Sequence, residues 1–204
     1  MIALRRLDTD RHGEDREDPP GVEGNRRLTT MLGGLLLLLL AIEGGTIPDL
    51  GQLEVVHVVV GLVLIPVVLL KLGTTFYRFA RYYSHQPAYR RAGPPHPVMR
   101  LLGPLVVLLT ISLFASGVAL VIAGRNANTV YAVHKASFIL WFGAMTIHVV
   151  GHLWSIPTVG VRDWTPRDRI SGSGLRRLVV VAAAVAGVAV AAIVYPLLPA
   201  WGHG

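Results

Sequence analysis

The residues of this sequence that could do metal or proton chemistry are histidines and one lysine inside apolar stretches. His57 and Lys71 lie in one such stretch, and His134, His148 and His152 lie in another. Ionisable side chains are rare inside membrane spans and usually have a function where they occur. The chain has no cysteine, which excludes disulfides, thiolate zinc sites, iron–sulfur clusters and c-type haem attachment. Ligand chemistry must therefore rest on imidazole, amine or carboxylate groups.

The spacing of these residues places possible ligands at two different depths along the helices, too far apart to bind one metal ion. His134 and His148 are fourteen positions apart, so on a helix both rings leave one face, about 21 Å apart along the axis. Each imidazole can bind the iron of a separate b-type haem, one near each leaflet. His57 and Lys71 repeat the same spacing. The sequence therefore predicts haem b, one or two per chain, with His57, His134 and His148 as candidate metal ligands.

Membrane-spanning helices must position these residues, and the composition favours such helices. Of the 204 residues, 52% are hydrophobic and 15% are charged, a balance typical of integral membrane proteins. Five apolar runs are of a length to cross, or nearly cross, the hydrocarbon core: 28–42 (continuing weakly to 47), 53–72, 101–123, 130–154 and 175–198. We expect an all-α transmembrane helical bundle of about five spans. A signal peptide is the other interpretation of the first run, but its long charged lead and lack of a small-residue cleavage site argue against it.

The spans divide the chain into four segments. Residues 1–27 mix arginines with acids and are expected to form a disordered cytoplasmic tail. Residues 28–154 form a four-helix core that contains every candidate ligand. Residues 155–174 form a cytoplasmic loop, and residues 175–204 form a fifth transmembrane helix with a short outer tail.

Arginine and lysine residues predict the orientation of the spans. Most of them lie in the tail and in the segments 77–100 and 155–177, whereas the turn 43–52 and the residues after 198 have none. The positive-inside rule then places the N-terminus in the cytoplasm and the C-terminus outside, in a multi-pass protein of the cell membrane. The second and fourth spans run parallel in this topology. His57 and His134, each about one turn into its span, are therefore expected at the same depth near the outer face.

This layout resembles that of the membrane cytochromes b. In the quinone-oxidising cytochrome b of respiratory complexes, two parallel helices, the second and fourth, each carry a pair of histidines and together hold two haems. The resemblance rests on His57, His134 and His148 and covers residues 28–154. The chain is also similar in layout to small four- or five-span cytochrome subunits of membrane oxidoreductases. The resemblance implies haem b and electron exchange with quinone or a partner redox subunit.

The sequence departs from that pattern at Lys71, which stands where the family has a histidine. Three roles for Lys71 remain open. Its amine can extend to the inner interface, ligate a second haem opposite His148 as a neutral amine, or pair with a haem propionate. His152, one turn beyond His148, could serve as a ligand there or form a hydrogen bond at the interface.

Glycines and cations near the two levels complete the candidate cofactor-binding residues. Gly103 and Gly117 are fourteen positions apart in the third span and would leave room for a haem edge at each level, although glycine is also common wherever membrane helices pack. Cationic side chains at the two edges could pair with haem propionates: Arg78, Arg81 and Arg100 at the inner edge, and Arg125 and Lys135 at the outer edge. The positive-inside bias explains the inner arginines equally well.

Two other functions remain open on sequence grounds. Intramembrane histidines also serve metal or proton transporters and assembly factors, and a non-haem membrane anchor would use them only for packing. The chain has no nucleotide-binding motif, so we expect the electron-transfer subunit of an oxidoreductase and not a complete enzyme. Small residues at 182–192 would allow a homodimer. The net charge of +7 fits membrane orientation, and no nucleic-acid partner is expected.

Overall fold

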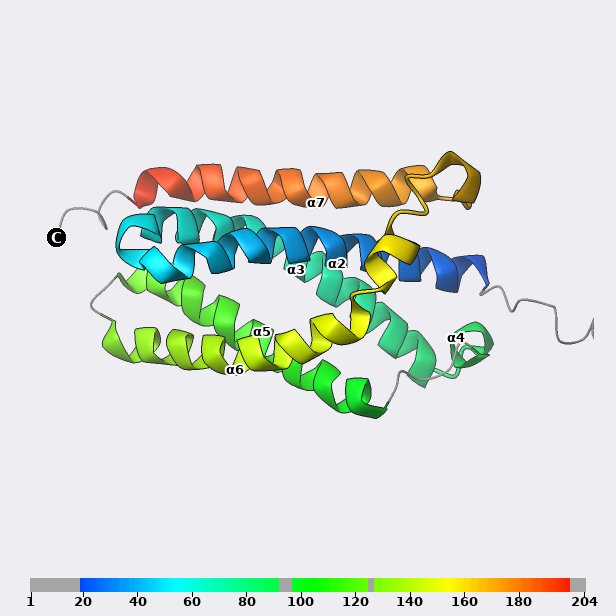
Figure 1. Cartoon of the computed structure of the whole chain (residues 1–204), viewed down its shortest axis with the longest axis horizontal. Helices are drawn as coiled ribbons and strands as arrows, with labels where there is room; N and C mark the ends of the chain where they lie inside the picture. The colour runs from blue at the N-terminus through cyan, green and yellow to red at the C-terminus, as the bar shows by residue number, and fades with distance from the viewer. Residues whose placement is uncertain (1–18, 92–96, 125–126, 199–204) are drawn as a thin grey trace, which may run out of the picture.

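The computed structural model describes residues 19–91, 97–124 and 127–198, and these residues form an all-α bundle without strands. Five long helices run back and forth along one direction (Figure 1): α2 (Pro20–Thr46), α3 (Leu50–Tyr83), α5 (Pro97–Ala123), α6 (Asn128–His152) and α7 (Ser173–Val194). Short elements connect or follow them: η1 (Ile47–Asp49), α4 (Pro87–Arg91), η2 (Ile156–Gly160), η3 (Pro166–Asp168) and η4 (Tyr195–Leu197). The predicted fold class is confirmed.

The long helices are apolar enough to cross a membrane. Four segments among the described residues meet the length and composition of a span, and the first of them, Gly21–Tyr83, contains both α2 and α3. The segment of α6 has a mean hydropathy of 1.3, against 2.5 to 2.7 for the others. This lower value follows from the histidines and the lysine that α6 carries. The helices are those of a membrane protein.

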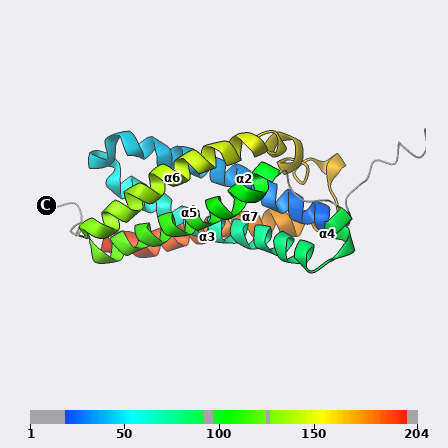
Figure 2. The ribbon, with the colours of Figure 1, turned by 90° about the horizontal axis from the view of Figure 1, so that it is seen from below.

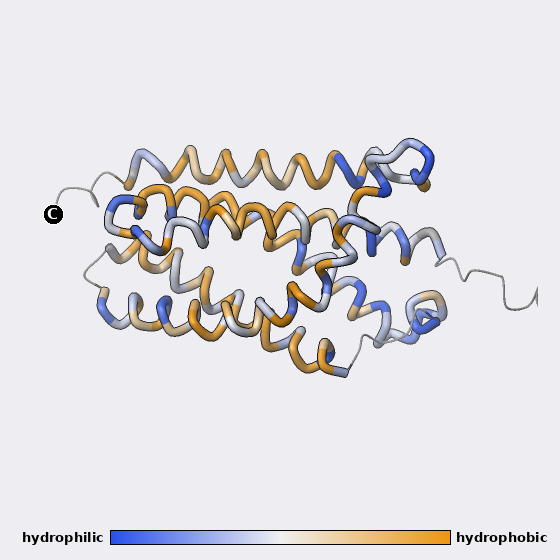
Figure 3. The backbone as a smooth tube through the Cα atoms, in the orientation of Figure 1, coloured by the Kyte–Doolittle hydropathy of each residue, from blue (hydrophilic) through white to orange (hydrophobic). Residues whose placement is uncertain are grey.

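The bundle has two ends of different chemistry. One end, here called the η1 end, holds η1, the end of α5 and the start of α6 (Figures 1 and 2). The opposite end, here called the α4 end, holds the start of α2, α4 and η3. Apolar residues line the middle of the helices and polar residues gather towards both ends (Figure 3). The arginines of segments 78–100 and 162–177 belong to elements at the α4 end, as the alternating charge pattern predicts for loops on one side.

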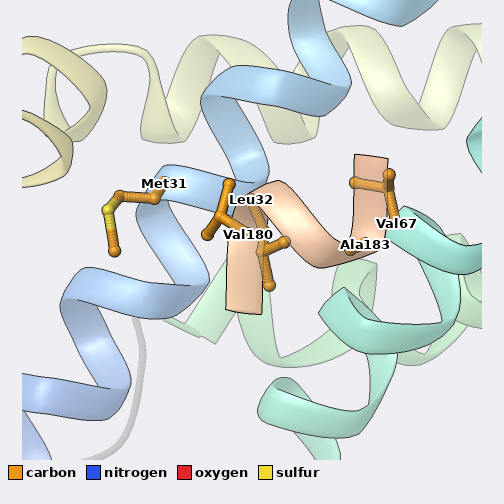
Figure 4. Packing of buried hydrophobic residues seen from close by; sticks show 5 residues of the cluster. All are labelled: Met31, Leu32, Val67, Val180 and Ala183. Atoms are coloured by element: carbon orange, nitrogen blue, oxygen red, sulfur yellow. The ribbon is translucent and has the colours of Figure 1, made fainter. Parts of the chain in front are cut away.

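Two packed groups of helices make up the bundle. In the first group, α3 packs against both α2 and α7, and their contact buries Leu32, Val67 and Val180 (Figure 4). In the second group, α5 packs along α6 around Leu102 and Ala144. Among the described residues, α3 contacts α5 only weakly, so the helices pack more closely within each group than between the groups.

Small residues on α7 face α3. Ala183, Gly187 and Ala191 are buried, and a Cβ built on Gly187 would lie only 2.3 Å from the carbonyl oxygen of Val63. Glycine is therefore required for this close approach, because any larger residue would push the two backbones apart. This part of the small-residue stripe at 182–192 is used within one chain. A second copy of the chain would have to contact the opposite face of α7.

The first helix begins at Pro20 and not at residue 28, so residues 20–27 are helical where the sequence predicted a disordered tail. Proline suits the first turn of a helix because its missing N–H has no partner there. Glu23 binds Arg26 and Arg27 within the same helix at 2.7 and 2.8 Å. Residues 1–18, which carry the rest of that prediction, lie outside the described residues.

The residues between α6 and α7 are also more ordered than a loop prediction suggests. Gly160 packs against Thr30, and Ile156 lies against Gly34, so η2 lies along α2. Asp163 is fully buried and forms ion pairs with Arg27 of α2 and Arg176 of α7. This carboxylate joins the start of α2, the α6–α7 connection and the start of α7.

Candidate functional site

His57 of α3 and His134 of α6 face each other near the η1 end. Their ring centroids are 6.5 Å apart and their ring planes are at 87°. One histidine belongs to each packed group of helices, so the pair marks a place where the two groups meet. The sequence predicted that these two residues share a depth, and the structure brings them together.

Two residues at the end of α2 contact the Nδ1 atom of the His57 ring. Its Nδ1 lies 2.9 Å from Oγ1 of Thr46 and 3.1 Å from Oε1 of Glu43. The Thr46 hydroxyl donates its own hydrogen to the carbonyl oxygen of Glu43, at 2.6 Å, so towards His57 it can only accept. Nδ1 of His57 must then carry the proton, which leaves Nε2 unprotonated in the neutral ring.

The ring of His134 is held in the same way by α5. Its Nδ1 lies 3.1 Å from the carbonyl oxygen of Leu113 and 3.1 Å from Oγ of Ser116. A carbonyl oxygen only accepts, so Nδ1 of His134 is also the protonated nitrogen and Nε2 is again the free one. No described residue donates a hydrogen bond to Nε2 of either histidine.

The distance between the two ring centroids is compatible with two ligands to one metal ion. A metal–imidazole bond of about 2 Å on each side puts two ring centroids roughly 6 Å apart, close to the 6.5 Å found here. Histidines that bind metal usually donate their second ring nitrogen to a carboxylate or a backbone carbonyl, as both do here. Among the described residues, no three His, Asp or Glu side chains converge as a non-haem metal site would require. Two axial imidazoles are a ligand set that suits haem, because the porphyrin supplies the remaining ligands.

The level of Lys71 and His148, nearer the α4 end, is built differently. Nζ of Lys71 donates to the backbone carbonyl of Thr29 on α2, at 2.6 Å, and no hydrogen bond joins it to His148, although the two side chains interact electrostatically. The His148 ring stacks on His152 with a centroid distance of 4.6 Å, and Nδ1 of His152 donates to the backbone oxygen of His148. Nδ1 of His148 is buried and has no hydrogen-bond partner among the described residues. The structure therefore places Lys71 within electrostatic range of His148, with its amine hydrogen-bonded to Thr29.

The two candidate glycines on α5 have different surroundings. A Cβ on Gly117 would lie 3.2 Å from Cε1 of His134, so this glycine makes room for the His134 ring. A Cβ on Gly103 would meet nothing within 4 Å. A third glycine, Gly61 of α3, lies beside Glu43, whose Oε1 would be 3.4 Å from its Cβ.

The described candidate cations make no hydrogen bond or ion pair with the two rings. Arg78 and Lys135 are exposed, and Arg125 lies outside the described residues. The guanidinium group of Arg81 lies over the ring of Tyr77, at 5.1 Å from its centroid. No described contact connects any of these cations to the candidate ligands.

Sequence reasoning missed the residues that orient the two rings. Thr46, Glu43 and Ser116 come from α2 and α5, neither of which carries a histidine. Glu43 was the strongest available signal, since a carboxylate at the end of an apolar run is uncommon. Ser116 and Thr46 carry no such signal, because small hydroxyl residues are common in membrane helices.

Comparison with known proteins finds no family model, no curated protein and no solved structure that matches this chain.

Proposed function

We propose that this protein is a membrane cytochrome that binds one b-type haem between α3 and α6, with His57 and His134 as axial ligands. The observation that carries this proposal is that both rings direct a protonated Nδ1 at a fixed acceptor while their centroids lie 6.5 Å apart. The haem iron, when bound, supplies one-electron redox chemistry. Thr46, Glu43 and Leu113 fix the tautomer and orientation of the two imidazoles, and Gly117 leaves space beside His134.

The proposed role is transmembrane electron transfer. No flavin, nicotinamide or molybdenum motif occurs in the sequence, so electrons would come from and go to a quinone or a partner redox subunit. The arginines at the α4 end support an orientation with that end and the N-terminus in the cytoplasm. The haem would then lie near the outer face of the cell membrane.

For the inner level we propose that Lys71 attaches α3 to α2 and does not bind a second haem. Its amine is already bonded to Thr29, at 2.6 Å, and a Cβ on Gly33 would lie 3.3 Å from Nζ. The absence of a side chain at Gly33 on α2 therefore leaves space for the Lys71 amine. A lysine that ligated iron would have to give up this hydrogen bond.

The test is the absorption spectrum of the purified protein, oxidised and then reduced with dithionite, with haem counted by pyridine haemochrome. We expect one b-type haem per chain. Two haems per chain would contradict the assignment of Lys71. A well-folded protein without haem, even after expression with added haem, would contradict the cytochrome proposal and favour a transporter or an anchor.

Single substitutions locate the haem. His57→Ala and His134→Ala should each abolish the haem signal, because each removes an axial ligand. His148→Ala is the matched control, since it removes a histidine from the same helix as His134 and should leave the spectrum unchanged. Lys71→Met should also leave it unchanged. Loss of haem in His148→Ala or Lys71→Met without loss of helical content would show that the ligands lie at the inner level.

A further inference from the structure

The end of α3 extends beyond the thickness of a membrane. This helix has 34 residues, which corresponds to roughly 51 Å, whereas the hydrocarbon core is ~30 Å thick. Near this end, the backbone oxygen of Thr74 accepts a hydrogen bond from Asn25 in the second turn of α2. Residues 75–83 of α3 continue past that point. These residues together with α4 are here called the α3–α4 arm (residues 75–91).

The α3–α4 arm has a defined shape. α3 ends at Tyr83, and His85, two residues later, has a positive φ of 60° where the chain reverses. α4 then folds back so that the ring of Tyr89 lies edge-on against Tyr77, with centroids 6.1 Å apart. Tyr89 is buried, although α4 has only five residues. The arm is therefore a packed unit at the α4 end of the bundle.

One face of the arm exposes a stripe of aromatic rings. Phe76, Phe79 and Tyr83 follow one another at helical spacing and are 69%, 54% and 54% exposed. Phe76 stacks on Phe79 with centroids 6.4 Å apart, and Phe79 lies 4.4 Å from Tyr83. Aromatic rings favour the boundary between the hydrocarbon core and the headgroups. In water, this contiguous stripe would leave a large apolar area uncovered.

The charge around the stripe has a single sign. Residues 73–100 contain five arginines and no Asp or Glu. Arg78, Arg90, Arg91 and Arg100 are exposed, and none of them forms an ion pair with a described acidic residue. Positive charge beside an apolar face is the pattern of segments that lie on anionic membrane surfaces.

We infer that the α3–α4 arm docks on the membrane surface and recognises anionic phospholipid headgroups, with its aromatic stripe at the headgroup boundary and its arginines against the phosphates. An anionic lipid surface is the occupant that this geometry favours, because the arm continues directly from a membrane-spanning helix. Arginine forms paired hydrogen bonds with phosphate groups, which adds to the electrostatic attraction. This docking does not depend on haem binding at the opposite end of the bundle.

Because the native chain has no cysteine, one introduced cysteine can be labelled specifically to test this inference. Ala80→Cys places a single thiol on the exposed side of α3 beside the stripe, where it can carry a spin label. The full chain is placed in lipid nanodiscs of phosphatidylcholine, either alone or with about one third phosphatidylglycerol. We expect the label to become more accessible to oxygen, and less accessible to a water-soluble nickel chelate, in the anionic discs. Equal accessibility of the label in both lipids would overturn the inference and favour a protein partner for the aromatic stripe.

A pair of double variants separates the arm from overall charge. Arg90→Gln with Arg91→Gln should abolish the effect of anionic lipid on the label. Arg167→Gln with Arg169→Gln is the matched control, because it removes two exposed arginines from the same end of the bundle, outside the arm. The control should keep the full effect. Loss of the effect in both double variants, or in neither, would overturn the role given to the arm. Circular dichroism confirms that each variant retains its helical content.

Discussion

The rings of His57 and His134 lie with centroids 6.5 Å apart, and each ring is held by a residue of its own helix group. Thr46 of α2 binds His57, and Ser116 of α5 binds His134. α2 packs on α3 and α5 packs on α6, whereas α3 and α5 contact each other only weakly. The distance between the rings is therefore set by how the two groups meet, and a ligand that both rings bind would join the groups.

The hydroxyl of Thr46 should matter for haem binding although it touches no iron. Thr46→Val keeps the shape of the side chain but removes the acceptor 2.9 Å from Nδ1 of His57. Loss of a residue that orients a metal ligand typically lowers metal affinity by about 10- to 100-fold. We expect the same range for haem, measured by titrating haem into the purified apoprotein.

The matched control for this prediction is Thr75→Val. Thr75 is exposed on the part of α3 nearer the α4 end and binds only the carbonyl oxygen of Lys71 in its own helix. This variant should bind haem like the parent protein. If both variants bound haem equally well, Thr46 would not orient the ligand.

Gly117 should be required for the position of His134. Gly117→Val would place a branched side chain where even a Cβ lies 3.2 Å from Cε1 of the ring. The ring would have to move, so we expect loss of most of the haem per chain with the helical content retained. Gly143→Val is the control, because a Cβ there meets nothing within 4 Å. Haem loss in the control alone would contradict the assignment of the site to this side of α6.

The sequence was sufficient to predict that His57 and His134 share a depth, because depth follows from helix boundaries and the alternation of positive charge. Helix boundaries and charge alternation can both be predicted from the order of residues along the chain. The partners of the two rings could not be predicted in this way. Contacts of Thr46 and Ser116 depend on how each helix is rotated about its axis, and the nearly uniform apolar composition of the spans gives little sign of that rotation.

The contacts of Lys71 and Asp163 with neighbouring segments could not be predicted from the sequence either. The sequence placed Lys71 opposite His148 by spacing alone, and the two side chains do interact electrostatically. The hydrogen bond of Lys71 to Thr29 on a neighbouring helix could not be predicted in this way. Asp163 lies in a polar stretch that is typical of an exposed loop, yet it is fully buried because Arg27 and Arg176 surround it. A buried ion pair between distant segments leaves no periodic pattern in the sequence.

The carboxylate of Asp163 should be a main determinant of stability at the α4 end. Asp163→Asn leaves two poorly exposed arginines without their shared counter-ion, as Arg27 and Arg176 both bind this side chain. Removal of one partner from a buried ion pair typically costs about 3–5 kcal/mol. We expect a clear fall in the unfolding midpoint of the detergent-solubilised protein. Asp168→Asn should have little effect, because Arg27 binds only the backbone oxygen of Asp168.

Acid should destabilise the protein through the same residue. Burial alone would raise the pKa of Asp163, but the hydrogen bonds and charges of Arg176 and Arg27 outweigh it and hold this pKa below its ordinary value. A carboxylate with a lower pKa in the folded state contributes stability above its unfolded pKa of about 3.9, and this contribution is lost as the pH falls towards the folded value. The parent protein should therefore lose stability between about pH 5 and pH 3, and Asp163→Asn should lack this part of the loss. Identical acid profiles for the two proteins would contradict the prediction.

The contact of α7 with α3 should depend on a single glycine. Gly187→Leu would force a side chain into a space where a Cβ already lies 2.3 Å from the backbone oxygen of Val63, so α7 must move away from α3. Overpacking of this kind typically costs about 1–3 kcal/mol, and more where backbone must shift. Ala186→Leu is the matched control, because Ala186 is exposed on the next position of the same helix. We expect a lower unfolding midpoint for Gly187→Leu and an unchanged one for Ala186→Leu. The opposite order would show that α7 packs through its other face, which is the face left for a second copy of the chain.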